Sequence, residues 1–262
     1  MKFIDTHCHL DAAEFEGQQP ARLTTARANG VACIIVPAVA RENFPIVEAL
    51  CAQSPECAPA YGIHPMYTDY AQPEDLTILR DYLGREKTVA VGEIGLDFFI
   101  DNYDRARQEH FFIEQLKLAR EFDLPLLLHI RRAQDIILKH LRKYPVRGGI
   151  AHAFNGSAQQ AAEFIKLGFK LGFGGAMTYP RATRLRQLAA TLPLDSLVLE
   201  TDAPDIPPVF LERYTPNAPE YLPKIAATLA ELRGLSLQEI ARSTRENALM
   251  AVPKLSLYPS TN

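Results

Sequence analysis

Two histidines near the start of the chain have the spacing of metal ligands. They belong to the run Asp5-Thr6-His7-Cys8-His9-Leu10, which follows the apolar stretch Lys2-Phe3-Ile4. If that stretch is a strand, side chains two residues apart point to the same side, so His7 and His9 can reach one ion. Asp5, one step earlier, would accept the second N–H of a ligand histidine and fix its tautomer. Histidine pairs also occur in polar surface turns, so the motif needs support from the rest of the chain.

The composition sets loose bounds on the kind of protein. The 262 residues are 47% hydrophobic and carry 28 basic and 31 acidic residues, a net charge of −3. Such a chain can bury a large core, as one α/β barrel or as two smaller domains. Its charge disfavours broad nucleic-acid coating but leaves room for a local phosphate site. The four cysteines show no disulfide or metal pattern, and no apolar run approaches the roughly 20 residues of a membrane helix. We therefore expect a soluble cytoplasmic protein with no membrane partner and no obligate protein partner.

Short apolar runs alternate with amphipathic stretches about eight times along the chain. Runs such as Leu126-Leu127-Leu128 are apolar on both faces, as in parallel strands covered by helices. We predict a single-domain (β/α)₈ TIM barrel over residues 1–262, with an open doubly wound sheet as the alternative. The predicted strands are Lys2–His7, Cys33–Pro37, Ala58–Gly62, Thr88–Gly92, Pro125–His129, Gly149–His152, Lys170–Gly174 and Ser196–Thr201. The predicted helices are Pro20–Asn29, Glu42–Gln53, Glu74–Arg85, Arg105–Phe122, Ala133–Lys143, Ala158–Leu167, Thr183–Thr191, Glu220–Arg233 and Leu237–Met250.

Polar residues gather at the ends of five of these predicted strands. Besides the histidine pair after the first strand, they are Glu93, His129, His152, Glu200 and Asp202. In a TIM barrel all these positions open onto the C-terminal mouth, where such enzymes place their chemistry. One histidine at a strand end is commonly just hydrogen-bonded. Agreement among five strands instead indicates a shared metal site.

Six ordered blocks of the sequence resemble the signature of the TatD family. They are Phe3–Asp11 (FIDTHCHLD), Gly62–Pro65 (GIHP), Val91–Asp97 (VGEIGLD), Leu128–Arg131 (LHIR), His152–Ser157 (HAFNGS) and Leu199–Pro204 (LETDAP). The H-x-H block is shared with the wider amidohydrolase superfamily, whereas the GEIGLD and ETDAP blocks together are more specific. The resemblance runs to about Pro253. It implies a TIM barrel and a divalent-metal-dependent hydrolase, usually a deoxyribonuclease that cleaves phosphodiester bonds.

The resemblance also implies a site with two divalent metal ions. One ion would be held by His7, His9 and Asp202, the second by His129 and His152, and both would be bridged by Glu93 with one oxygen each. Mixed imidazole and carboxylate ligands suit Zn²⁺, Mn²⁺ or, less comfortably, Mg²⁺. Two such ions can polarise a phosphoryl oxygen and activate a water. Asp202 is the predicted catalytic base, and Glu200 is predicted to orient a ligand from one layer deeper.

Further side chains are candidates for substrate contact at the predicted mouth. His64 would bind a phosphate oxygen or protonate the leaving group, or else only hydrogen-bond loop backbone. Arg131 and Arg181 would clamp a phosphate, or else be solvated residues near helix starts. Asp97 would continue the site or simply cap its loop.

Three classes of function stay open at this point. The first is a two-metal phosphodiesterase on single-stranded or frayed DNA ends, since an acidic protein attracts a duplex weakly. The second is a hydrolase of a small ester, lactone or amide on the same fold. Relatives of that second kind often bridge their metals with a carboxylated lysine, where this chain has Glu93. The third is a binding protein with a structural metal. A complete ligand set together with a carboxylate that can act as a general base disfavours this class.

Overall fold

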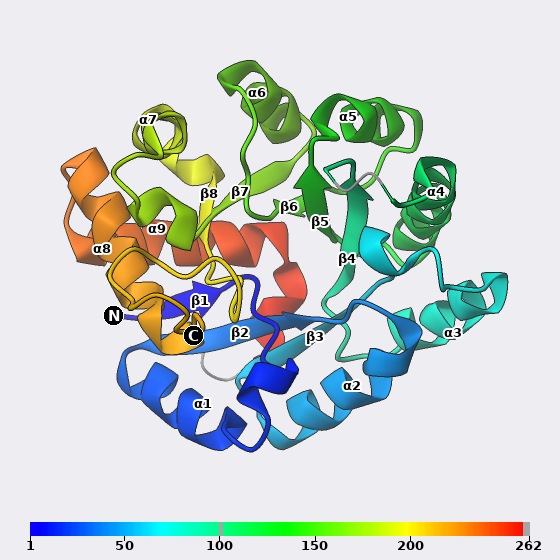
Figure 1. Ribbon diagram of the computed structural model, residues 1–262, viewed down its shortest axis with the longest axis horizontal. Coiled ribbons are helices and arrows are strands. Elements are labelled where there is room, and N and C mark those ends of the chain that lie inside the picture. The colour runs from blue at the N-terminus through cyan, green and yellow to red at the C-terminus, as the bar shows by residue number, and fades with distance from the viewer. Residues whose placement is uncertain (100–101, 259–262) are drawn as a thin grey trace.

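Eight parallel strands form one sheet in the computed structural model, in sequence order from β1 to β8 (Figure 1). The sheet closes because Thr6 N donates to Leu199 O (3.1 Å) and Asp202 N donates to His7 O (2.8 Å), which joins β1 to β8. The predicted TIM barrel is therefore confirmed. The strands are β1 (Phe3–Asp5), β2 (Val31–Pro37), β3 (Cys57–Tyr61), β4 (Ala90–Asp97), β5 (Leu126–Arg131), β6 (Gly149–Ala151), β7 (Phe169–Phe173) and β8 (Leu197–Leu199).

Helices follow the strands and form a ring outside the barrel, while α9 crosses behind the strands in the view of Figure 1. The structure describes residues 1–99 and 102–258, and no helix within those ranges is long and apolar enough to cross a membrane. The helices are α1 (Gln19–Ala28), α2 (Phe44–Gln53), α3 (Pro73–Leu83), α4 (Arg105–Glu121), α5 (Gln134–Lys143), α6 (Ala158–Lys166), α7 (Thr183–Thr191), α8 (Leu222–Arg233) and α9 (Leu237–Ala251).

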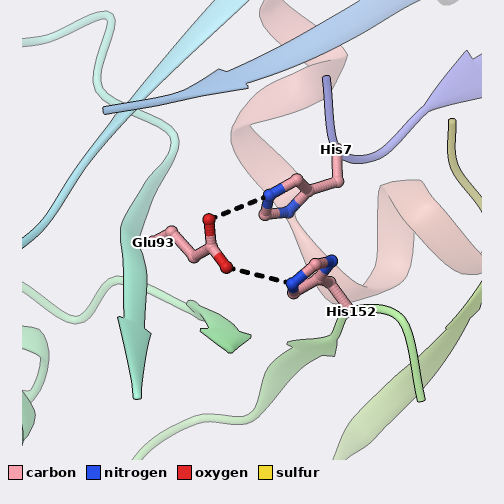
Figure 2. A group of neighbouring side chains, drawn as sticks. All are labelled: His7, Glu93 and His152. Atoms are coloured by element: carbon pink, nitrogen blue, oxygen red, sulfur yellow. Dashed lines mark hydrogen bonds and ion pairs between the residues drawn. The ribbon is translucent and has the colours of Figure 1, made fainter. Parts of the chain in front are cut away.

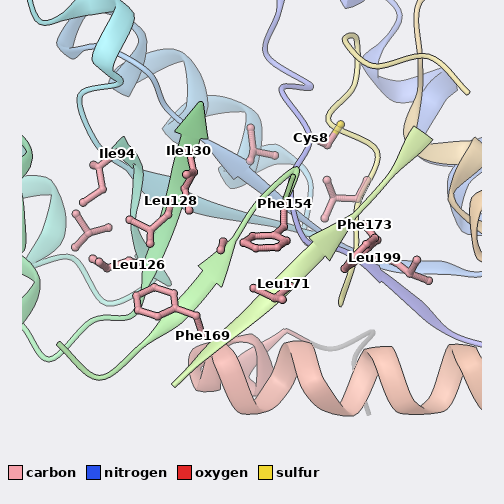
Figure 3. Close-up of a cluster of buried hydrophobic side chains, with 14 of the residues drawn as sticks. Cys8, Ile94, Leu126, Leu128, Ile130, Phe154, Phe169, Leu171, Phe173 and Leu199 are labelled. Atoms are coloured by element: carbon pink, nitrogen blue, oxygen red, sulfur yellow. The ribbon is translucent and has the colours of Figure 1, made fainter. Parts of the chain in front are cut away.

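Strand β5 shows how the core is divided into two layers. Its residues Leu126, Leu128 and Ile130 belong to the large apolar cluster between the strands and the outer helices (Figure 3). Leu127 belongs to a second cluster, which takes side chains from β1 to β6 and β8 together with Ala248 and others from α9. Because neighbouring strand residues point to opposite sides, this second cluster fills the barrel interior. Residues placed above it therefore face the barrel mouth.

Strand β4 is longer than the sequence analysis predicted. The predicted strand ends at Gly92, whereas the observed strand continues to Asp97, so Glu93 lies inside it. Its pairing with β5 shifts register between Val91 and Ile94. Gly95 is required there, because a Cβ on its backbone would lie 1.9 Å from His129 O. The predicted end fails because a pairing with a register shift is a tertiary feature that strand periodicity does not contain.

Asp5 joins the two ends of the barrel. Its carboxylate accepts hydrogen bonds from Thr201 N (2.9 Å), Thr201 Oγ1 (2.6 Å) and His7 N (3.3 Å). The prediction that Asp5 fixes the tautomer of a ligand histidine is therefore wrong. Strand β1 ends at Asp5, so the alternation that was expected to carry Asp5, His7 and His9 on one face stops before the histidines.

Replacing Thr201 by valine removes the hydroxyl that donates to Asp5 while keeping the side-chain shape. We expect the free energy of unfolding to fall by about 1–3 kcal/mol, because a buried carboxylate oxygen loses a donor. Urea denaturation followed by circular dichroism, with divalent metal chelated, measures the change. Thr191→Val is the control, since the Thr191 hydroxyl donates to Gln187 O on the exposed end of α7. Equal stability of the two variants would contradict this role of Asp5.

Candidate metal centre

Strand alternation brings three site residues above the interior cluster. Leu127, Ile150 and Val198 lie in that cluster, and His129, His152 and Glu200 follow them by two residues on the same chain segments. Residues two apart on a strand point to the same side. The three side chains are therefore directed toward the barrel axis at the C-terminal ends of β5, β6 and β8. Glu93 comes from β4, and His7 and His9 come from the segment after β1.

Three donor atoms form a nearly equilateral triangle at the centre. His7 Nε2 lies 3.3 Å from His9 Nε2 and 3.2 Å from Glu93 Oε2, and His9 Nε2 lies 3.3 Å from the same oxygen. Tetrahedral ligands about 2.0–2.1 Å from a Zn²⁺ ion are separated from one another by about 3.3 Å. Asp202 Oδ1 lies 3.7 Å from His7 Nε2. The donor set and its spacing thus fit one small divalent cation.

The other oxygen of Glu93 faces a second set of imidazoles. Oε1 lies 2.9 Å from His129 Nδ1, 3.0 Å from His152 Nε2 and 3.5 Å from His64 Nε2. Figure 2 shows the carboxylate between His7 and His152, with one oxygen toward each ring. Among the described residues, the groups compact enough to hold an ion are His7 with Glu93 and His152, His7 with His9 and Asp202, and His64 with Glu93 and His129. The other five predicted ligands therefore gather around Glu93, while a shared ion for His129 and His152 stays a prediction.

His64 lies deeper than a rim position. Its ring is buried edge-on against His129, with 4.3 Å between the ring centroids. Met66 N donates a hydrogen bond to His64 Nδ1 (3.2 Å), so a neutral ring carries its proton on Nε2. That N–H points to the side of the cluster where Glu93 Oε1 lies. The geometry therefore suits a hydrogen-bond donor better than a metal ligand.

Asp97 both continues the site and caps its loop. Its Oδ2 lies 3.1 Å from His129 Nε2, and its Oδ1 accepts a hydrogen bond from Phe99 N (2.9 Å). Burial by itself would raise the pKa of Asp97, but these partners outweigh burial and lower it. Asp97 can therefore hold the proton of His129 on Nε2 and leave Nδ1 free toward Glu93. The sequence alone leaves both roles of Asp97 open.

Glu200 is buried next to His152, and its predicted role in orienting a ligand stays a prediction. Its Oε1 accepts a hydrogen bond from Ala153 N (2.5 Å) and lies 3.9 Å from His152 Nδ1. Gly172 on β7 makes room for the carboxylate, because a Cβ there would lie 2.1 Å from Glu200 Oε2. Burial raises the pKa of Glu200 to about 8. The position suits a residue that orients His152.

Comparison with known proteins places the chain in a family. The family of TatD related DNases matches residues 4–252. This chain belongs to the TatD family. It is 45% identical over 249 residues to the uncharacterized metal-dependent hydrolase YjjV of Escherichia coli K12, which covers 94% of this chain and 96% of that protein. The crystal structure of the E. coli YjjV, a TatD homologue, superposes with a TM-score of 0.92 at 44% identity and covers 96% of this chain and 98% of that one.

A further relative carries a more specific name. The 3′-5′ ssDNA/RNA exonuclease TatD of Cronobacter sakazakii is 32% identical over 251 residues, which cover 94% of this chain and 95% of that protein. Together with the family match, these relatives make the chain a metal-dependent hydrolase of the TatD family. The clusters of histidine and carboxylate side chains in the barrel mouth are able to bind its metal.

Glu93 governs the charge states of the histidines around it in this TatD protein. Burial alone would raise the pKa of Glu93, but the imidazoles of His64, His7 and His152 hold it well below its usual range. Burial and the nearby His152 lower the pKa of His7 to about 3. Glu93 raises the pKa of His9 to about 9 and that of His152 to about 10, in spite of their burial. Because metal ligands need an ionised carboxylate and neutral imidazoles, a bound cation has to replace the protons of His9 and His152. Burial also raises the pKa of Asp202 above its usual range.

The two arginines predicted to bind phosphate lie in different surroundings. Arg131 ends β5 and is half-exposed, with its guanidinium 3.9 Å from Asp97 Oδ2. Arg181 is exposed in the turn before α7, where it lies 5.4 Å from the ring of Tyr179. Among the described residues, Arg181 has no contact with the histidine cluster. The TatD fold thus brings Arg131 beside the centre, while a role for Arg181 stays a prediction.

Glu93→Gln tests whether this carboxylate is the shared ligand. A neutral amide has one oxygen and one N–H₂ group, so it can ligate on one side at most, and it removes the negative charge that both cations need. We therefore expect metal to be lost on both sides of the residue. Elemental analysis of purified protein should show near-complete loss, whereas His152→Ala should keep part of the metal. Glu163→Gln, which breaks only the surface ion pair with Arg142, serves as the control. Full metal content in Glu93→Gln would rule out the shared position.

Proposed function

We propose that the protein is a two-metal phosphodiesterase that removes nucleotides from the ends of single-stranded DNA. The observation that carries the proposal is that the two oxygens of Glu93 face separate sets of imidazoles. His7, His9 and Asp202 would hold one cation, His129 and His152 would hold the other, and Glu93 would be a ligand to both. The ligand set suits Zn²⁺, Mn²⁺ or Mg²⁺. Two cations so held would supply Lewis-acid activation of a phosphoryl oxygen and of the attacking water.

Asp202 is assigned as the general base. Its Oδ1 lies 3.7 Å from His7 Nε2 and 3.8 Å from His152 Nδ1, so it stands between the two sets of imidazoles. The backbone of Asp202 has a φ of +57°, a left-handed conformation that aspartate adopts more readily than most residues other than glycine. From this position the carboxylate takes the proton of the attacking water.

His64 is assigned to the substrate. Because Met66 N donates to its Nδ1, its Nε2–H faces the cluster, where Glu93 Oε1 lies 3.5 Å away and where a phosphoryl oxygen would approach. A donor held in this way stabilises charge that develops on that oxygen. Arg131, two residues beyond His129 on β5, is placed to pair with a neighbouring phosphate. Arg181 is kept as a second, more distant phosphate contact.

Two further points favour nucleic acid ends as the substrate. The C. sakazakii relative is named as an exonuclease on single-stranded DNA and RNA. The net charge of −3 gives little long-range attraction to a duplex, so binding must rest on a few local contacts. A strand end can enter a ring of loops at the barrel mouth more easily than a continuous duplex can. Hydrolysis of small esters alone would instead favour the second class of function considered from the sequence.

Asp202→Asn separates proton transfer from metal binding. The amide keeps an oxygen that can ligate but cannot take a proton, so we expect turnover to fall by about 10²–10⁴-fold while some metal remains. Hydrolysis of single-stranded DNA and metal content are measured on the same preparation. Asp195→Asn, in the surface turn before β8, is the control. Near-normal hydrolysis by Asp202→Asn would assign the base to another residue.

Linear and circular single strands test the preference for ends. We expect linear strands to be degraded and circles to survive, with a slope of log affinity against log salt of only about −2 to −3. Arg131→Ala should make that slope shallower by up to about one and leave the metal content intact. Duplex DNA, RNA and small esters complete the panel. If circles are cut as fast as linear strands, the model of end capture is wrong.

A further inference from the structure

An exposed aromatic ring next to the centre carries two guanidinium groups. Phe99 is 43% exposed, and the guanidinium carbons of Arg131 and Arg132 lie 3.8 Å and 4.5 Å from the centre of its ring. We call these three residues the Phe99 cluster. At such distances both guanidinium groups make cation–π contacts with the ring. Flat surfaces and positive charge are thus presented together to solvent.

The register of β4 and β5 places the Phe99 cluster one step above the metal centre. Gly95 pairs with His129, and Asp97 pairs with Arg131. Two residues along a strand correspond to about 6.6 Å, and His129 and Arg131 share one side of β5. Phe99 N also donates to Asp97, whose other oxygen contacts His129 Nε2. Asp97 therefore connects the Phe99 cluster to the metal centre, and the cluster lies on the side of the centre that faces the barrel mouth.

The turn after β5 is shaped so that both arginines reach the same ring. In a continued strand, Arg131 and Arg132 would point to opposite sides. The strand ends at Arg131, and Arg132 takes a φ of +54°, in the left-handed region. Within the part of the chain that the structure describes, Arg132 has no carboxylate partner, and Arg131 approaches only Asp97, at 3.9 Å. Much of the positive charge of the pair therefore remains available to an anion.

We propose that the Phe99 cluster is a subsite for the nucleotide next to the scissile bond. The base stacks on the planar groups of the cluster, and the adjoining phosphate pairs with the arginines. Single-stranded nucleic acid is commonly held by aromatic rings and arginines that stack on bases, together with positive charge along the backbone. A ligand that has only a phosphate would not use the ring, and one that has only an apolar face would not use the arginines. The inference rests on the proposed phosphodiesterase function.

The test is binding of a labelled single-stranded oligonucleotide, followed by fluorescence anisotropy with the metal-loaded protein. Phosphorothioate linkages at both ends prevent cleavage, and a second oligonucleotide lacks the terminal bases but keeps every phosphate. We expect Phe99→Leu to weaken binding of the complete oligonucleotide by about 5- to 100-fold, the range for one lost stacking contact. It should leave the affinity for the oligonucleotide without terminal bases unchanged. Phe99→Tyr keeps the ring and should bind like wild type.

Phe210→Leu is the matched control, because Phe210 is 41% exposed on the β8 to α8 segment and lies near Lys224, away from the Phe99 cluster. Metal content and melting temperature show that each variant is folded. If Phe99→Leu binds both oligonucleotides like wild type, or loses the same factor on both, the base-stacking role is wrong. If Phe210→Leu loses as much affinity for the complete oligonucleotide as Phe99→Leu does, exposed aromatic rings around the barrel mouth contribute alike and the assignment to Phe99 fails. If wild type binds neither oligonucleotide, the proposed function itself fails.

Discussion

The negative charge of Glu93 is the interaction on which the centre depends. Five histidines each place a ring nitrogen within 3.5 Å of one of its two oxygens: His7, His9, His64, His129 and His152. So many imidazoles pack together only if their lone pairs point at cations or their protons at a carboxylate. Glu93 is ionised in this setting and supplies one oxygen to each half of the cluster. The centre can therefore divide into two cation positions without a second bridging side chain.

The barrel makes that arrangement possible by closing on itself. Glu93 comes from β4, its partners come from β5 and from the segments after β1, β3 and β6, and Asp202 follows β8. Asp5 binds Thr201, which immediately precedes Asp202, and so fixes the seam between the first and last strands. If that seam opened, His7 and Asp202 would move apart. The carboxylate that fixes this seam, Asp5, is thus a different residue from the carboxylates of the centre, Glu93 and Asp202.

The parts that follow from periodicity could be predicted, and the parts that follow from packing could not. Helix α7 lies at Thr183–Thr191, as predicted, because an amphipathic repeat determines it locally. The gathering of the six predicted ligands follows from the TIM-barrel rule that strand ends share one mouth. The role of Asp5 could not be predicted because β1 ends at Asp5, earlier than periodicity suggests. The burial of His64 could not be predicted because it depends on how the loop after β3 packs against His129.

Asp97 shows why the metal centre and the Phe99 cluster have to be considered together. One of its oxygens faces the Nε2 of His129, and the other holds the backbone N–H of Phe99. A change at Asp97 would therefore disturb a histidine of the centre and the loop that carries the ring at the same time. The Phe99 ring contacts the arginines and no residue of the histidine cluster among the described ring contacts. A substitution at Phe99 can thus change the proposed contact with the substrate while the arrangement around Glu93 stays unchanged.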